Sequence, residues 1–255
     1  MKIDICVLTA GQRPDLLDKC LQSIKPFAEA TKSPVYVYGN GVKDVLAPTI
    51  YNQSFITYKA SKTNRGFPYG ANKAIDMGNN SLVLFVSDDI EFTVGAIEHA
   101  VETMKDKSIG LLGFKLLFQH GSKNPGGLVQ HVGHACDVHG QVFHPFLGWS
   151  PDNPRTCVSG EVFSVTGATF MVRRDLFRAA GKFNEMYGNG YFEDVELALN
   201  IRSRRAKIWL DAQAVAYHYV GATFEKLGGS DLQRNRQLFM ANNSDRLVWD
   251  TWARY

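Results

Sequence analysis

Two pairs of adjacent carboxylates, far apart in the chain, are the residues best suited to chemistry. Asp88 and Asp89 follow a short apolar stretch, and Glu193 and Asp194 lie in a second acidic segment, YFEDVE. Proteins commonly hold Mg²⁺ or Mn²⁺ with one or two carboxylates plus substrate phosphates. A carboxylate can also remove the proton of an attacking hydroxyl. The two pairs together predict a metal-assisted displacement.

Each pair also has a purely structural interpretation. Residues 82–86 are almost continuously apolar, which predicts a strand covered on both faces. Ligands bind beyond the carboxyl ends of strands in an open α/β sheet, so Asp88 and Asp89 are expected to face a cleft. The same pair can instead form a turn or cap a helix. Glu193 and Asp194 can simply favour the start of a helix through its dipole.

The elements that must position these residues alternate between strand and helix in the first half of the chain. Apolar residues at helical spacing, such as Leu17, Cys20 and Leu21, and turn residues at the boundaries define them. Strands are predicted at residues 3–9, 35–38, 55–58, 82–86 and 109–118, and helices at 15–27, 69–77 and 94–104. This alternation is typical of a doubly wound α/β sheet.

The second half of the chain has a different pattern. Residues 121–154 are rich in glycine, proline and histidine, which predicts a hairpin and loops. Strands are predicted at residues 162–173, 208–210 and 214–219, and helices at 174–180, 194–205 and 231–252. No repeat or low-complexity linker divides the sequence, so we expect one domain over residues 1–255.

Composition excludes several classes of protein. The 255 residues are 45% hydrophobic and 21% charged, which suits a globular protein with a buried sheet. A formal charge of +3 with scattered basic residues does not indicate nucleic-acid binding. Cys6, Cys20, Cys136 and Cys157 form no CxxC pair, so we expect reduced and mostly buried thiols, not a zinc or redox site.

Targeting segments are not evident either. The apolar stretch at residues 3–8 is too short for a signal peptide, and the run at 109–118 is too short to cross a bilayer. The sequence therefore predicts a cytoplasmic protein without a transmembrane segment.

An ordered series of motifs covers nearly the whole chain. In chain order they are ICVLT (5–9), CLQSI (20–24), NRGF (64–67), GANKA (70–74), LFVSDD (84–89), QHVG (130–133), VTGA (165–168), GKFNE (181–185), FEDVE (192–196), YH (217–218) and DTW (250–252). The series resembles the inverting family 2 glycosyltransferases, especially the rhamnosyltransferase-like members of surface polysaccharide synthesis. The resemblance implies a GT-A fold, in which helices cover both faces of a Rossmann-like mixed central sheet.

The resemblance also implies a role for each matching residue. Asp89 would contact Mn²⁺ or Mg²⁺ on the donor diphosphate, and Asp194 would be the general base. Glu193 would sit beside the acceptor or help orient the catalytic site. His218 would contact the metal or diphosphate, although it can also be a partly buried strand histidine. The implied donor-binding residues are Thr9, Ala10, Arg13, Asn40, Arg65, Asn72, Ser87 and Asp88, and the acceptor-binding residues are Gly167, Ala168 and His131.

The implied substrates follow from the same family. The donor would be a UDP-, dTDP- or GDP-sugar, and the acceptor a glycan or glycolipid. Residues 1–118 would form the nucleotide-sugar-binding half, residues 119–230 the acceptor-binding and catalytic half, and residues 231–255 a C-terminal helix. Peripheral membrane contact is compatible with a glycolipid acceptor, and no nucleic acid partner is expected.

One segment departs from the family pattern. After the second strand the family usually has an acidic residue or a DNGS run that contacts the base, whereas this chain has YGNG, with Asn40 third. An amide donates and accepts hydrogen bonds, so Asn40 can still meet a uracil edge. The departure leaves a catalytically silent nucleotide-sugar or glycan-binding module as the alternative. A dinucleotide-dependent dehydrogenase is disfavoured because the first strand leads into TAGQRP, not GxGxxG.

Histidines gather between His120 and His144. Their spacing fits no closed zinc pattern. We expect them to be loop histidines at an acceptor cleft.

Overall fold

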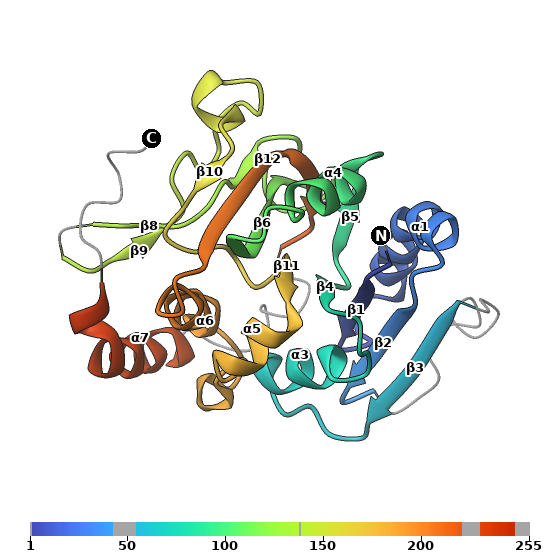
Figure 1. The fold of residues 1–255 in the computed structure, drawn as a ribbon, viewed down its shortest axis with the longest axis horizontal. Helices are drawn as coiled ribbons and strands as arrows, with labels where there is room; N and C mark the ends of the chain where they lie inside the picture. Colours follow the sequence, from blue (N-terminus) through green and yellow to red (C-terminus); the bar gives the residue numbers. More distant parts are fainter. Residues whose placement is uncertain (1, 43–54, 138, 221–229, 248–255) are drawn as a thin grey trace.

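A ten-stranded mixed sheet runs through the molecule (Figure 1). The computed structural model describes residues 2–42, 55–137, 139–220 and 230–247. The sheet contains β1 (Asp4–Thr9), β2 (Val35–Asn40), β3 (Ile56–Ser61), β4 (Leu82–Ser87), β5 (Ile90–Phe92), β6 (Ile109–Phe118), β7 (Val129–His131), β10 (Gly160–Glu161), β11 (Thr169–Arg173) and β12 (Lys207–His218). A separate two-stranded sheet pairs β8 (Ala135–Cys136) with β9 (Val142–Phe143).

The strand order explains why residues from both halves of the chain meet. The order is β10-β12-β6-β11-β4-β1-β2-β3, with β5 beside β12 and β7 beside β6. Strands β3, β2, β1 and β4 are parallel, whereas β11 is antiparallel to both of its neighbours, β4 and β6. The carboxyl ends of β1, β2 and β4 therefore lie at one edge, the usual place for ligands in such sheets.

Helices cover both faces of the sheet. The α-helices are α1 (Pro14–Thr31), α3 (Phe67–Ile75), α4 (Ala96–Thr103), α5 (Arg174–Ala179), α6 (Glu193–Arg202) and α7 (Ser230–Asn243), and the short 3-10 helices are Pro154–Cys157, Glu185–Tyr187 and Ser244–Arg246. On β1, Ile5 and Val7 pack with α1 and α4, while Cys6 and Leu8 pack with α3, α5 and α6. Because successive side chains alternate between faces, burial on both faces requires the continuous apolar run seen in the sequence.

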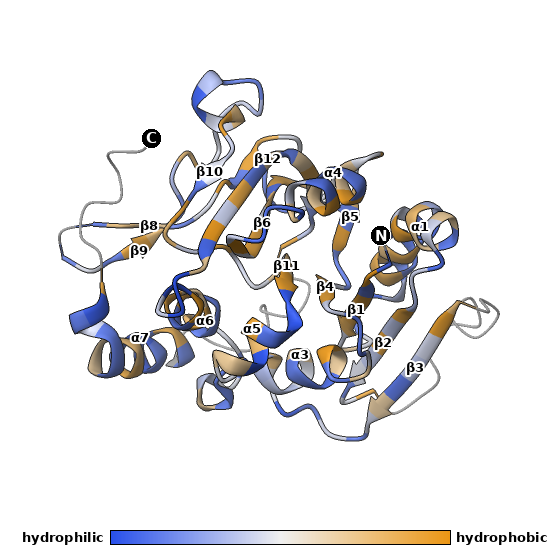
Figure 2. Ribbon diagram, in the orientation of Figure 1, coloured by the Kyte–Doolittle hydropathy of each residue, from blue (hydrophilic) through white to orange (hydrophobic). Residues whose placement is uncertain are grey.

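Hydropathy follows this arrangement. Figure 2 shows hydrophobic residues along the central strands and many hydrophilic residues along α7. Helix α1 begins with Pro14, whose fixed φ suits the first turn, and it buries Leu17, Cys20, Leu21 and Ile24 on one stripe. The first half of the chain thus forms its predicted elements, with boundaries shifted by a few residues.

The structure differs from the prediction in three places, two in the second half of the chain and one, β5, in the first half. Only Thr169–Arg173 of the strand predicted at 162–173 forms β11. The strands predicted at 208–210 and 214–219 are one strand, β12, whose register shifts between Asp211 and Val215. Strand β5 was not predicted, because three residues give no periodic signal.

Several other expectations can be compared with the described residues. Helix α7 ends at Asn243, before the predicted end at 252, and the DTW motif lies outside the described residues. Cys6, Cys20 and Cys136 are buried and Cys157 is exposed, and all are free thiols. Among the described helices, none combines the length and apolarity needed to cross a bilayer.

Candidate active site

Both acidic pairs line one cavity of about 540 Å³. Asp88 and Asp89 reach it from the carboxyl end of β4, and Glu193 and Asp194 reach it from the start of α6. Residues 166–168, which lead into β11, form part of the wall between them. The structure thus brings together the carboxylates that the sequence separates by about a hundred residues.

Asp88 is held by the end of β1. Its backbone N–H donates to the carbonyl of Leu8 at 3.1 Å, and the hydroxyl of Thr9 donates to Asp88 Oδ2. Burial raises the pKa of Asp88 to about 7, and the negative charge of Asp89 acts in the same direction, against the Thr9 hydrogen bond. A cation or a hydrogen-bond donor brought into the cavity would therefore favour the ionised form of Asp88.

Asp89 faces His218 across the β5–β12 pairing. Ile90 pairs with His218, and His218 Nε2 lies 3.4 Å from Asp89 Oδ2. His218 Nδ1 lies 3.2 Å from Gln130 Oε1, an acceptor, so Nδ1 carries the proton in this pair. A neutral His218 then turns the lone pair of Nε2 towards Asp89.

This donor set fits a divalent cation. A ligating histidine normally donates its second ring N–H to an oxygen acceptor, as His218 does to Gln130. Asp89 adds a carboxylate oxygen, the ligand type that Mg²⁺ and Mn²⁺ prefer. A cation between Asp89 Oδ2 and His218 Nε2 would satisfy both lone pairs.

The second pair follows a strained turn. Tyr191 and Phe192 both have left-handed backbone conformations, with φ of 73° and 72°. Residues other than glycine adopt this conformation uncommonly, and such strain clusters at functional sites. The ring of Phe192 stacks on Phe239 of α7 at a centroid distance of 5.1 Å. This packing fixes the turn that directs Glu193 and Asp194 to the cavity.

Asp194 is fixed by two backbone amides. Gly167 N–H donates to Oδ2 at 2.9 Å, and Val195 N–H donates to Oδ1 at 2.8 Å. Burial raises the pKa of Asp194, and the hydrogen bond from Gly167 is the largest opposing effect. A Cβ at position 167 would lie 3.3 Å from the ring of Phe67, so glycine allows the close approach. Asp194 is thus an oriented carboxylate that is more basic than an exposed aspartate.

Glu193 is the least satisfied polar group of the site. Its side chain is buried, and Oε2 has no hydrogen-bond partner among the described residues. Burial raises the pKa of Glu193 well above its ordinary value, and the charge of Asp194 adds to the effect. A protonated Glu193 can donate a hydrogen bond to a group in the cavity.

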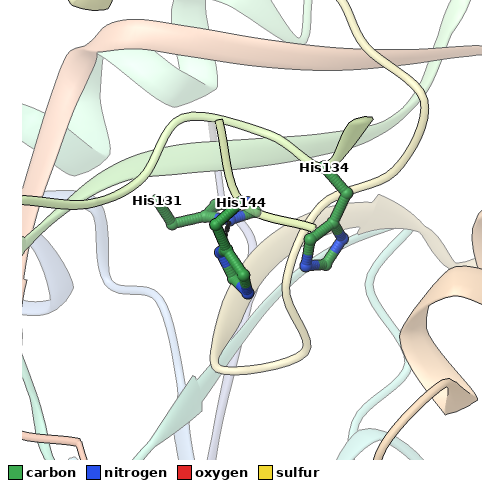
Figure 3. Close-up of side chains that lie close together, drawn as sticks. All are labelled: His131, His134 and His144. Carbon is green, nitrogen blue, oxygen red and sulfur yellow. Dashed lines mark hydrogen bonds between the residues drawn. The ribbon is translucent and has the colours of Figure 1, made fainter. Parts of the chain in front are cut away.

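Three histidines gather beside Asp194 (Figure 3). His134 and His144 line the cavity, whereas His131 lies behind its wall. Burial lowers the pKa of His134 to about 4 and that of His144 to about 3, and it lowers the pKa of His131 well below its ordinary value. All three rings are therefore neutral near pH 7.

Most of the predicted site residues line the cavity. These are Thr9, Ala10, Asn40, Ser87, Asp88, Asp89, Gly167, Ala168, Glu193, Asp194 and His218. Asn40 is largely engaged already, because its amide nitrogen donates to Asn64 Oδ1 and the Gly66 carbonyl while its oxygen accepts from Arg65 N–H. Through these hydrogen bonds Asn40 holds the loop at residues 64–66.

The remaining predicted residues do not line the cavity. Arg13 pairs with Asp15 at 2.6 Å, and Arg65 lies over the ring of Tyr69. Asn72 bridges to the backbone of Phe183, donating to its carbonyl and accepting from its N–H. His131 contacts His144 and the backbone of Thr166. The substrate contacts that the family resemblance implies for these four residues stay predictions. In this structure their side chains have partners within the protein.

Several cavity residues were missed by the sequence analysis. They are Leu8, Asn64, Gly66, Phe67, Gln130, His134, Val142, His144, Thr166, Asn189, Tyr191, Phe192, Val195, Val220 and Leu232. Many lie in loops, where no periodicity marks which side chains turn inward. The histidine-rich segment and the QHVG motif were the available signals for His134, His144 and Gln130.

Curated relatives match only part of the chain, and no protein-family model matches it. The O-antigen biosynthesis protein RfbC of Myxococcus xanthus is 29% identical over 165 residues, which is 62% of this chain. The uncharacterized protein y4gI of Sinorhizobium fredii is 26% identical over 166 residues, again 62% of this chain. The chain spans 12% and 18% of the lengths of these two proteins.

Solved structures match nearly all of the chain. GalNAc-T7 with UDP, GalNAc and Mn²⁺ aligns over 98% of this chain and 52% of its own, with a TM-score of 0.72 and 11% identity. S. aureus TarS 1-349 with UDP-GlcNAc aligns over 100% of this chain and 69% of its own (TM-score 0.63, 17% identity). The Pyrobaculum calidifontis mannosyltransferase PcManGT, with GDP-Man and Mn²⁺, aligns over 88% and 58% (TM-score 0.60, 14% identity). The predicted fold class is confirmed: the chain has the GT-A glycosyltransferase fold.

Proposed function

We propose that the chain is a metal-dependent glycosyltransferase that moves a sugar from a nucleotide diphosphate to an acceptor hydroxyl with inversion. The observation that carries the proposal is the single cavity shared by two differently arranged acidic pairs. One pair lies beside Nε2 of His218, and the other includes Asp194, which is oriented by backbone amides. Structures of the same fold were solved with UDP-GlcNAc or with GDP-Man and Mn²⁺, which supports a nucleotide-sugar donor.

The donor side lies at the carboxyl ends of β1, β2 and β4. Asp89 and His218 would hold Mn²⁺ or Mg²⁺, which would neutralise the charge of the departing diphosphate. Asp88, fixed by Thr9, would contact the ribose or sugar of the donor. Ala10 and Ser87 line the same cavity.

The acceptor side lies at the start of α6. Each oxygen of Asp194 accepts one backbone N–H and keeps a lone pair for an incoming hydroxyl. Asp194 would take the hydroxyl proton while the acceptor oxygen attacks the anomeric carbon and the bond to the diphosphate breaks. One direct displacement inverts the configuration of that carbon. Gly167 and Ala168 leave room for the acceptor beside the base.

The substrate class follows from the relatives as a proposal. The name of the Myxococcus protein concerns O-antigen biosynthesis, which supports a role in surface polysaccharide or glycoconjugate synthesis and a glycan or glycolipid acceptor. In this proposal residues 1–118 chiefly bind the nucleotide sugar and residues 119–230 supply the acceptor site and the base.

A donor screen tests the proposed function. Thermal shift of the chain with UDP-, dTDP- and GDP-sugars, with and without Mn²⁺, should show selective stabilisation by one donor that depends on the metal. That donor should then be hydrolysed slowly, with release of free nucleoside diphosphate. Stabilisation without any release or transfer would point to a catalytically silent binding module, and no stabilisation by any donor would contradict the proposal.

A further inference from the structure

The three buried histidines form a hydrogen-bonded chain whose proton positions can be assigned. Thr166 N–H donates to His131 Nε2 at 3.1 Å, so this nitrogen carries a lone pair. A neutral imidazole has one N–H, which must then be on His131 Nδ1. His131 Nδ1 lies 2.9 Å from His144 Nδ1, and the dashed line in Figure 3 marks this contact. His131 is therefore the donor and His144 Nδ1 the acceptor.

The assignment fixes the free end of His144. Because His144 Nδ1 accepts, the single proton of the neutral ring is on Nε2. Figure 3 shows the far end of this ring turned away from His131. No described residue accepts a hydrogen bond from Nε2, and His144 lines the cavity. The chain thus ends in an N–H donor offered to a ligand.

The same backbone segment orients this donor and the base. Thr166 N–H holds His131, and the next amide, Gly167 N–H, holds Asp194 at 2.9 Å. The charge of Asp194 acts on His144 strongly enough to oppose the lowering of its pKa. Asp194 and His144 therefore line the same cavity, and residues 166–167 hold Asp194 directly and His144 through His131.

A metal site is the competing use of three clustered histidines. Their nitrogen atoms lie within 4.8 Å of one another. However, His131 uses one nitrogen to accept from Thr166 and the other to donate to His144. It has no lone pair left for a metal in this arrangement, and losing the Thr166 contact would leave a backbone N–H unsatisfied. The hydrogen bonds therefore favour ligand recognition over metal binding.

We propose that His144 binds the acceptor by donating its Nε2–H to an oxygen of the acceptor glycan next to the hydroxyl that Asp194 deprotonates, and that His131 positions His144. The substrate class in this inference rests on the proposed function. The assignment of the histidine protons rests only on the hydrogen bonds and is independent of that function. It shifts acceptor recognition from His131, which the sequence analysis favoured, to the unassigned His144. Acceptors without an oxygen acceptor beside the reacting hydroxyl should be poor substrates.

The first test reads the tautomers directly. Protein with ¹⁵N-labelled histidine is examined by long-range ¹H–¹⁵N correlation near neutral pH, and His131→Phe, His134→Phe and His144→Phe variants assign the rings. We expect His131 protonated on Nδ1 and His144 on Nε2, and we expect His144 to lose its single tautomer in His131→Phe. Protonation of His144 on Nδ1 in the unmodified protein would overturn the inference, whether or not the protein is a transferase.

The second test separates acceptor recognition from donor chemistry. Transfer to a panel of methyl glycosides and hydrolysis of the donor are measured for the unmodified protein, His144→Phe, His144→Gln and the exposed control His139→Phe. Loss of one neutral hydrogen bond should lower kcat/KM for a methyl glycoside about tenfold in His144→Phe, a larger fall than that in donor hydrolysis. His144→Gln, which keeps an N–H donor, should recover part of the loss, and His139→Phe should behave as unmodified protein.

These experiments distinguish failure of the inference about His144 from failure of the proposed function. If the unmodified protein neither hydrolyses nor transfers any donor, the proposed function fails while the tautomer test still stands. If it transfers but His144→Phe keeps the full kcat/KM, the inference fails alone. Titration with Zn²⁺ alone addresses the metal alternative: stoichiometric binding that is retained in Asp89→Ala but lost in His131→Phe and His144→Phe would overturn the inference.

Discussion

The two acidic pairs are alike in sequence but are stabilised in different ways. Carboxyl groups of both pairs have raised pKa values: that of Asp88 is raised to about 7, that of Asp194 is raised, and that of Glu193 lies well above its ordinary value. Asp88 accepts a hydrogen bond from Thr9, whereas Glu193 Oε2 has no partner among the described residues. Their neighbours differ too, since Asp89 faces a histidine and Asp194 is fixed by two amides.

Because the two pairs are stabilised differently, they can have different roles in the same cavity. The pair at the end of β4 lies where an added cation would compensate its charge, beside the lone pair of His218. In the pair at the start of α6, fixed backbone N–H groups compensate the charge of Asp194 and leave its carboxylate able to take a proton. We therefore propose cation binding for the first pair and proton transfer for the second, and the first two substitutions below test this proposal.

Replacement of Asp194 by Asn should have the largest effect. It removes the proton acceptor while keeping the size of the side chain, so transfer should fall by roughly 10²–10⁴-fold. Donor binding in the presence of Mn²⁺, measured by calorimetry, should stay nearly unchanged. Asp152→Asn, at an exposed position, is the matched control. Unchanged turnover of Asp194→Asn would remove the proposed role of the second pair.

Replacement of Asp89 by Ala should have the opposite signature. The cation would lose a carboxylate ligand, so Mn²⁺-dependent donor binding should weaken on the order of a hundredfold. The metal-independent part of donor binding should persist, and so should the folded state. Calorimetric titration of the donor with and without Mn²⁺ measures both quantities. Equal Mn²⁺ dependence in the variant and the unmodified protein would contradict the division of roles.

A third substitution tests the close contact between the segment before α3 and the segment before α6. Gly66, before α3, has φ of 91°, and a methyl group there would overlap the carbonyl of Gly188, before α6. Gly95 has a similar φ of 82° but has nothing within 4 Å of the added carbon. Gly66→Ala should therefore cost about 2 kcal/mol more unfolding free energy than Gly95→Ala. Equal losses of unfolding free energy in the two variants, measured by urea unfolding, would show that the positive φ alone, and not the overlap with Gly188, determines the cost.

The smallest effect concerns the pH dependence of stability. The pKa of Glu193 is raised in the folded state, so the unfolded chain ionises first, near the ordinary value of 4.5. Glu193 therefore costs nothing below that pH and destabilises the fold increasingly as pH rises above it. Glu193→Gln removes this cost, so its Tm should match unmodified protein at acidic pH and exceed it by a few degrees near pH 7. A Tm difference that shrinks as pH rises would contradict the raised pKa.

Sequence patterns predicted the first half of the molecule better than the second. Continuous apolar runs such as residues 82–86 must be buried on both faces, and this determined both the strand and the location of Asp88 and Asp89 at its end. Residues 162–168 were also predicted as strand, but apart from an isolated bridge between Ser164 and His134 they form a loop, of which residues 166–168 line the cavity.

The site was predictable where a residue ends a regular element and unpredictable where it lies in a loop. Asp194 lines the cavity from the helix start at which it was expected, and His218, whose role was implied only by the family resemblance, lies at the end of a strand. Nothing local distinguishes His131, which is covered, from His144, which lines the cavity. That distinction depends on hydrogen bonds between residues 13 to 35 positions apart.

The antiparallel strand β11 connects the two sides of the cavity through the main chain. Because β11 lies between β4 and β6, it brings Ala168 next to Ser87, whose N–H donates to the Ala168 carbonyl at 2.8 Å. The two sides of the cavity are thus joined through main-chain atoms, whose positions do not depend on the identity of nearby side chains. If the proposed function holds, side-chain substitutions at cavity positions other than Gly66 can alter which sugars bind without displacing this main-chain connection.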